Sequence, residues 1–128
     1  MRVDTHLKID PSLVGEPLEV GEGTAVAQLV TRPVMAADER DLVHGGFTFA
    51  LADYAAMLAV NDPNVVLGAA QVRFTGPVKV GETLVARASV QQVENKKRLV
   101  ECSVSVGDRT VFQGTFTCFV LGQHIFDQ

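Results

Sequence analysis

The sequence predicts an α+β fold in which one long apolar helix is wrapped by a curved antiparallel sheet of five to six strands. The helix is predicted by residues 47–60, which are almost entirely apolar and are rich in Ala, Leu and Met in their second half. The sheet is predicted by four stretches of about ten residues that follow the helix. Strands of that length are long for a small domain, and they fit a strongly twisted sheet that curls around a cylinder.

The predicted helix has no polar face. Leu51 and Leu58 lie on one side of a helical projection and Phe49 and Met57 on the other. A helix that is apolar all round must be buried on all sides, so we expect it at the centre of the protein. Its single charged residue is Asp53, and burying an unpaired carboxylate costs several kcal/mol. That residue therefore needs either a partner or a function.

The composition indicates one globular domain. The chain has 128 residues, of which 47% are hydrophobic and 20% charged. A net charge of -4 and a pI near 5.2 argue against nucleic acid as the main partner. No apolar run follows Met1, and the charge-free run 42–52 is too short to span a membrane. We therefore expect a cytoplasmic protein that has no membrane partner.

The two cysteines are expected to be buried free thiols. Cys102 and Cys118 both fall at inward positions of predicted strands. A disulfide or a catalytic thiol fits this pattern less well. No Cys/His spacing resembles a metal site, so we expect no metal.

Along the chain, residues 1–23 are expected to form an irregular N-terminal arm, because Pro and Gly interrupt every pattern there. Residues 24–35 are rich in β-forming side chains, and Pro33 indicates an edge or a strand end. A polar connection leads to the helix, which Asn61-Asp62-Pro63-Asn64 ends. The predicted strands after the helix are residues 65–75, 83–93, 99–106 and 110–121. We expect a single domain over residues 1–128 with its core at 24–121.

Two motifs resemble those of a known family. The stretch H-G-G-F-T-F-A-L-A-D, residues 44–53, is similar to the helix start of the hotdog-fold acyl-CoA thioesterases, in particular the phenylacetic-acid-degradation type. Residues 72–90 resemble the strand, proline-glycine link and strand of the same family. The resemblance covers roughly residues 24–121. It implies a hotdog fold, in which two subunits pair their sheets into one and two active sites form at the dimer interface.

The resemblance also implies a function. It points to a hydrolase, a thioesterase that cleaves a small or medium acyl-CoA thioester and acts as a homodimer or a dimer of dimers. Its partner would be the small-molecule thioester, with coenzyme A as part of the substrate and no other cofactor. The implied catalytic acid is Asp53, the oxyanion donor is the backbone N–H of Gly46, and His44 is the neighbouring polar residue. Many members carry an asparagine six residues before the histidine, where this chain has Asp38.

Physical chemistry supports these roles and also offers alternatives. A desolvated carboxyl at Asp53 has a raised pKa, which suits a general base near neutral pH, or it attacks the thioester as a nucleophile. It could instead be a structural acid that pairs with a backbone group or with an arginine across the subunit interface, for example Arg73. The N–H groups of Gly45 and Gly46 at a helix N-terminus can meet a developing oxyanion. Glycines there also allow close backbone packing.

The remaining candidates are charged and lie outside the helix. Asp38 is expected either in a solvated loop or at the entrance of the pocket. Lys96, Lys97 and Arg98 form a predicted hairpin tip, which is either merely exposed or binds the phosphates of coenzyme A.

Two rival functions remain open. The first is a hotdog-fold hydratase or dehydratase acting on enoyl or 3-hydroxyacyl thioesters, whose sites pair an Asp with a His ahead of the helix. In this chain Glu39, not an aspartate, stands five residues before His44. The second is a non-catalytic acyl-CoA-binding module, which would use the same cleft without needing Asp53.

Overall fold

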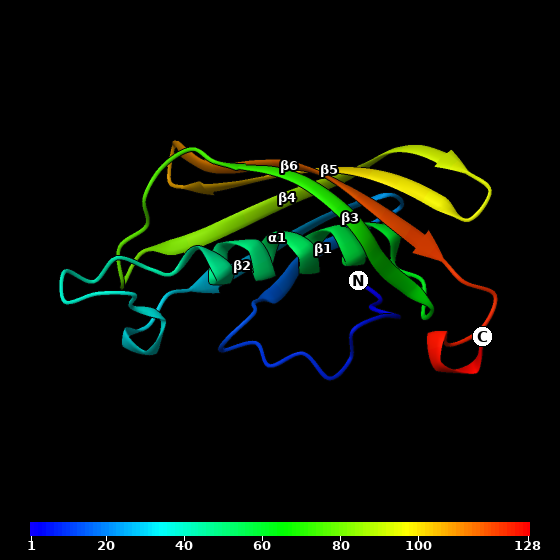
Figure 1. Cartoon of the computed structure of the whole chain (residues 1–128), viewed down its shortest axis with the longest axis horizontal. Helices are drawn as coiled ribbons and strands as arrows, with labels where there is room; N and C mark the ends of the chain where they lie inside the picture. Colours follow the sequence, from blue (N-terminus) through cyan, green and yellow to red (C-terminus); the bar gives the residue numbers. More distant parts are fainter.

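A single α-helix, α1 (Gly45–Val60), lies inside a curved sheet of six antiparallel strands (Figure 1). The structure is a computed structural model and describes residues 1–128. Its strands are β1 (Glu16–Gly21), β2 (Thr24–Val30), β3 (Val65–Phe74), β4 (Thr83–Glu94), β5 (Lys97–Val106) and β6 (Arg109–Val120). Two short 3₁₀ helices, η1 (Pro33–Met35) and η2 (Ile125–Asp127), complete the chain.

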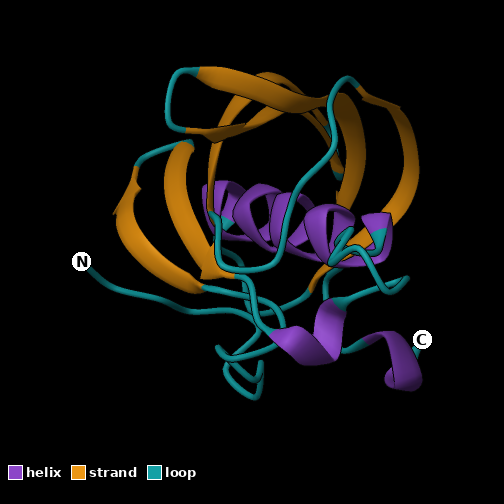
Figure 2. Ribbon diagram, turned by 90° about the vertical axis from the view of Figure 1, so that its left-hand side faces the viewer, coloured by secondary structure: helices purple, strands orange, loops and turns teal.

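The strand order is β1-β2-β4-β5-β6-β3, so β1 and β3 are the two edges of the sheet. Every neighbouring pair runs antiparallel. Figure 2 shows how the sheet bends around α1, as the long strands predicted. The predicted α+β class and the hotdog architecture are both confirmed.

The helix α1 forms where the apolar run predicted it. The His44 side chain caps its N-terminus, and Asn61 ends it in a left-handed conformation with φ of 53°. Most of the helix is buried against the sheet. Its buried residues are Thr48, Leu51, Ala52, Tyr54, Ala55, Ala56, Met57, Leu58 and Ala59.

The prediction that residues 1–23 are all irregular is wrong for residues 16–21, which form β1. Pro17 does not prevent this, because β1 is an edge strand and needs only one partner. The pairing with β2 shifts between Pro17 and Glu19, so a bulge accommodates the proline. The strand is also mostly exposed, which removed the alternation on which the prediction depended.

Residues 1–15 are fastened to the helix. The Asn61 side chain accepts a hydrogen bond from the Asp4 N–H at 2.8 Å and donates one to the Arg2 carbonyl at 2.9 Å. Val3, Ile9 and Val14 pack against the core. The arm thus runs below α1, away from the sheet (Figures 1 and 2).

Both cysteines are free thiols with at most 3% of their surface exposed, as predicted. No helix has the length and apolar character that crossing a bilayer requires.

Candidate active site

Asp53 lies on α1 with one carboxylate oxygen, Oδ1, buried and without a hydrogen-bond partner. Desolvation raises the pKa of this carboxyl to about 6. The two ion pairs of the chain are Arg2–Asp4 and Glu82–Arg109, so Arg73 does not neutralise Asp53 within the chain. The helix therefore carries a carboxylate that is destabilised and unpaired, which is the arrangement expected for a reactive acid.

The surroundings of Asp53 are apolar. Burial raises the pKa of both thiols, Cys102 and Cys118, to about 12, and the Asp53 charge adds to the effect. Those cysteines belong to β5 and β6, so the carboxylate faces the inner surface of these two strands.

One face of α1 connects Asp53 to the helix start. Gly45, Phe49 and Asp53 follow each other at intervals of four residues and therefore share this face. The Phe49 ring lies 5.6 Å from Phe116 and 6.3 Å from Phe112, both on β6. Aromatic rings of the core thus pack against the helix between the glycines and the carboxylate.

Phe74 extends this aromatic cluster to the edge of the sheet. It is the last residue of β3, and its ring meets Phe112 edge to face at a centroid distance of 5.2 Å. A Cβ added at Gly45 would lie 3.1 Å from the Phe74 ring. Because 55% of Phe74 is exposed, the aromatic cluster reaches the surface of the protein beside Gly45.

Of the two glycine N–H groups at the helix start, one is hydrogen-bonded and the other is free. The Gly46 N–H donates a hydrogen bond to Nδ1 of His44 at 2.7 Å. The Gly45 N–H has no acceptor in the chain. The sequence prediction named Gly46 as the oxyanion donor, but in this structure the His44 ring occupies that donor and the neighbouring Gly45 amide is free.

Backbone hydrogen bonds hold this helix start in place. The Val43 N–H donates to the Val78 carbonyl at 2.8 Å, and the His44 N–H donates to the Met35 carbonyl at 2.9 Å. The glycine amides are therefore positioned by the loop between β3 and β4 and by η1.

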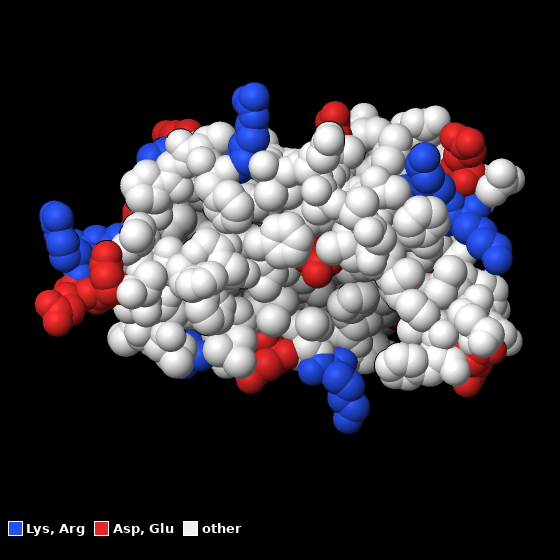
Figure 3. Space-filling model, in the orientation of Figure 1, with Lys and Arg blue, Asp and Glu red and all other residues white.

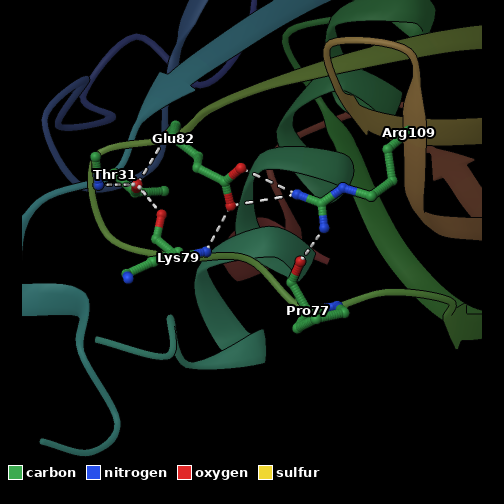
Figure 4. A network of polar contacts seen from close by, with 6 residues as sticks. Thr31, Pro77, Lys79, Glu82 and Arg109 are labelled. Carbon is green, nitrogen blue, oxygen red and sulfur yellow. Dashed lines mark hydrogen bonds and ion pairs between the residues drawn. The ribbon is translucent and has the colours of Figure 1, made fainter. Parts of the chain in front are cut away.

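A polar network stabilises that loop (Figure 4). The Arg109 guanidinium donates to both carboxylate oxygens of Glu82, at 3.0 and 3.2 Å, and to the Pro77 carbonyl at 2.8 Å. The Glu82 carboxylate also accepts from the Lys79 N–H at 2.8 Å. The buried Thr31 hydroxyl donates to the Glu82 carbonyl at 2.6 Å. Sequence reasoning missed this network because its members are far apart in the chain and carry no local pattern.

Asp38 has a local structural role. Its carboxylate accepts hydrogen bonds from the N–H groups of Arg40 at 2.9 Å and Leu42 at 3.2 Å, which fixes the loop before α1. The same loop lines a cleft of about 590 Å³ together with Lys79 and Arg109. Asp38 thus lies at a surface cleft near the helix start.

Lys96, Lys97 and Arg98 lie at the other end of the molecule. Lys97 begins β5, and the hairpin that contains these residues lies beside the C-terminal end of α1 (Figure 1). Arg98 donates to the Asn95 carbonyl at 2.7 Å, within the hairpin itself. A helix of 16 residues is about 24 Å long, so within one chain this basic tip is distant from the glycine amides.

Charged side chains are unevenly distributed over the face shown in Figure 3. Charged side chains occur mostly at the rims of the face in Figure 3, and one acidic group is visible among uncharged side chains near its middle. A wider hollow of about 810 Å³ lies on the outer face of the sheet and does not include Asp53. No group of three His, Cys, Asp or Glu side chains is arranged to hold a metal ion.

Relatives with known names share most of this chain. A methylthioribose-1-phosphate isomerase of Aquifex aeolicus is 48% identical over 94% of the chain, which spans 27% of that protein. A transcription factor FapR of Bacillus velezensis is 32% identical over 84% of the chain, which spans 58% of it. The chain therefore matches only part of these curated relatives.

Solved structures agree closely with the fold. Protein PH1136 of Pyrococcus horikoshii is 51% identical with a TM-score of 0.98, covering 99% of this chain and 98% of that one. A point mutant of the phenylacetic acid degradation protein PaaI of Thermus thermophilus is 28% identical with a TM-score of 0.80, covering 88% and 100%. The predicted resemblance to the phenylacetic-acid-degradation type is confirmed.

Residues 41–113 match the thioesterase superfamily, and this segment contains the whole of α1 with Asp53, the strands β3, β4 and β5, and the start of β6. The chain belongs to the thioesterase superfamily.

Proposed function

We propose that the protein hydrolyses a small or medium acyl-CoA thioester, with Asp53 as the reacting acid. The observation that carries this proposal is the buried, partnerless Oδ1 of Asp53 on a helix that is otherwise almost entirely apolar. A structural carboxylate in such a place would have a partner, because an unpaired one destabilises the fold. Its raised pKa leaves it mostly ionised at neutral pH while keeping it basic enough to accept a proton.

In the general-base route, Asp53 takes a proton from water as the water oxygen bonds to the thioester carbon. The carbonyl electrons move to oxygen, and the resulting oxyanion accepts hydrogen bonds from amides at a helix N-terminus. Gly45 and Asp53 of one helix lie eight residues, or about 12 Å, apart, so these amides would come from the partner subunit in a dimer. The C–S bond then breaks, and the leaving thiolate receives the proton from Asp53. In the nucleophilic route, the carboxylate itself bonds to the carbon, the thiolate leaves, and water hydrolyses the anhydride.

The two candidate oxyanion donors, the N–H groups of Gly45 and Gly46, differ in whether they are already hydrogen-bonded. The Gly45 N–H is free, whereas the Gly46 N–H becomes available when the His44 ring turns away. His44 would therefore stabilise the helix start before substrate binds and then release its donor to the substrate. One such donor contributes roughly 3 kcal/mol to lowering the barrier.

The proline substitutions Gly45→Pro and Gly46→Pro test which amide acts, since each removes one N–H. Gly46→Ala is the matched control, because it keeps the N–H but crowds the His44 ring, whose Nδ1 would lie 2.8 Å from the new Cβ. The proposal expects kcat to fall about 100-fold or more in at least one proline variant. Unchanged kcat in both folded proline variants would contradict it.

We also propose that the active unit is a dimer formed through β3. This edge strand has ten residues, is largely apolar, and exposes residues 68–71. Long apolar edges pair with other strands unless they are protected. The opposite edge, β1, is protected by Pro17, a bulge and the charges of Glu16 and Glu19. Pairing through β3 would bring two Asp53 sites to one interface.

The decisive experiment is a thioester panel from acetyl- to palmitoyl- and aryl-CoA, followed by release of free thiol. Asp53→Asn should abolish turnover of the preferred substrate while leaving the fold intact. A wild-type protein that hydrolyses none of these thioesters, or an Asp53→Asn variant with full turnover, would refute the proposal.

The second candidate is a non-catalytic acyl-CoA-binding module. The relatives described as transcription factors favour it, since those proteins are named for regulation rather than hydrolysis. The two candidates differ in Asp53→Ala: in an enzyme this change removes turnover and leaves ligand affinity intact. A module would bind acyl-CoA equally well with or without Asp53 and would never release thiol.

A further inference from the structure

The C-terminal segment 122–128 presents apolar side chains to solvent from an ordered turn. Phe126 is 90% exposed and Ile125 is 48% exposed. The turn is held by its own hydrogen bonds: the Phe126 N–H donates to Nδ1 of His124 at 3.0 Å, and the Gln128 amide donates to the Gln123 carbonyl at 3.0 Å. Phe126 and Ile125 are thus neighbouring apolar side chains that this turn holds in an exposed position.

This segment leaves the sheet at the start of β3. Val120 pairs with Val65, and the Leu121 N–H donates to the Asn64 carbonyl at 3.3 Å. The tail therefore lies beside the C-terminal end of α1, on the β3 side of the molecule (Figures 1 and 2). Phe74, the exposed ring beside Gly45, is at the opposite end of the same strand.

A segment at one end of β3 cannot reach the other end in the same chain. Ten residues of strand span about 33 Å. Seven residues reach at most about 23 Å when fully extended, and those of the tail are coiled into a turn.

In a dimer paired through β3, the tail of one protomer can reach the Phe74 end of the other protomer's strand. A twofold axis perpendicular to the sheet pairs the two β3 strands antiparallel and keeps both helices on the same face. The Val65 end of one strand then meets the Phe74 end of the other. The tail of one protomer is thereby carried to the helix start of its partner.

We propose that residues 122–128 of each protomer cover the helix start of the partner subunit, with Phe126 against the partner's Phe74. This inference rests on the proposed function and on the β3 dimer. The tail would close over the apolar acyl group of the thioester and exclude water from it.

A cross-link tests the placement without any need for activity. Two forms of the chain with different affinity tags, Phe126→Cys in one and Phe74→Cys in the other, are co-expressed, purified as mixed dimers and treated with a short bis-maleimide. The native thiols are buried and give little background. We expect an efficient cross-link between the two tagged forms. The matched control pairs Phe126→Cys with Val93→Cys, an exposed position on β4, and should give little product.

A complementation experiment tests whether the tail helps to bind the acyl group and which protomer supplies it. Phe126→Ala should raise KM for medium-chain acyl-CoA by about three- to tenfold and leave KM for acetyl-CoA nearly unchanged. In a mixed dimer, one chain carries both Asp53→Asn and Phe126→Ala and the other is wild type, so the one working site combines the wild-type Asp53 with the helix start of the doubly substituted chain. If the tail acts across the dimer, the wild-type tail covers that helix start and the working site has the wild-type KM.

The outcomes separate the two proposals. A mixed dimer that keeps the KM of the Phe126→Ala protein, a cross-link no stronger than the control, or a monomeric wild-type protein would overturn the tail inference. Absence of turnover with every thioester would overturn the proposed function, while the cross-link would still decide where the tail lies.

Discussion

Replacing Asp53 by asparagine should make the protein more stable at neutral pH while removing its activity. The substitution keeps the shape of the side chain and removes its charge. Burial raises the Asp53 pKa from 3.8 to about 6. Each pKa unit corresponds to about 1.4 kcal/mol, so the ionised carboxylate destabilises the folded state by about 3 kcal/mol.

The pH range follows from the direction of the shift. Because the pKa is higher in the folded protein, the folded state binds the proton more tightly than the unfolded state does. The penalty is complete well above pH 6, shrinks as the pH falls through about 6, and is absent below the unfolded value of 3.8. The stabilisation by Asp53→Asn should therefore be full at pH 7.5 and nearly zero at pH 4.

Urea denaturation measures this difference at several pH values and at one protein concentration, so that oligomerisation does not confound it. The matched control is Asp108→Asn, an exposed aspartate in the β5–β6 turn, which should show no comparable gain. Equal stability of wild-type protein and Asp53→Asn at pH 7.5 would refute the claim that Asp53 is a buried unpaired charge. In the same preparation, hydrolysis should fall by at least about 100-fold.

Three further predictions concern rate, coupling and thiol reactivity. With the preferred thioester, kcat/KM should decrease about tenfold per pH unit below about pH 6 as Asp53 takes up a proton, and a flat pH–rate profile would contradict its role. Arg109→Ala should lower kcat without touching the reacting groups, because the loop held through Glu82 positions the helix start. Arg109→Lys should rescue it only partly, since one ammonium replaces the two guanidinium nitrogens that donate separately to Glu82 and to the Pro77 carbonyl. Cys102 and Cys118 should not react with a thiol reagent in the native protein and should both react in urea; fast labelling of the folded protein would show that they are accessible.

The sequence by itself predicted the helix, five of the six strands and the unusual acid. These features depend on local pattern: a long, almost entirely apolar run rich in Ala, Leu and Met predicts a buried helix, and alternating side chains predict a half-buried strand. The strand β1 escaped this reasoning because an edge strand with a proline and a bulge has neither a buried face nor strict alternation.

Only the tertiary structure decided how the candidate residues are engaged. The lack of a partner for Asp53 Oδ1, the capture of the Gly46 amide by His44 and the position of Phe74 beside Gly45 all depend on which side chains meet in space. The same holds for the distance between the hairpin at Lys96 and the helix start. A sequence records which groups are available, but their partners come from segments far apart in the chain, and folding alone brings those segments together.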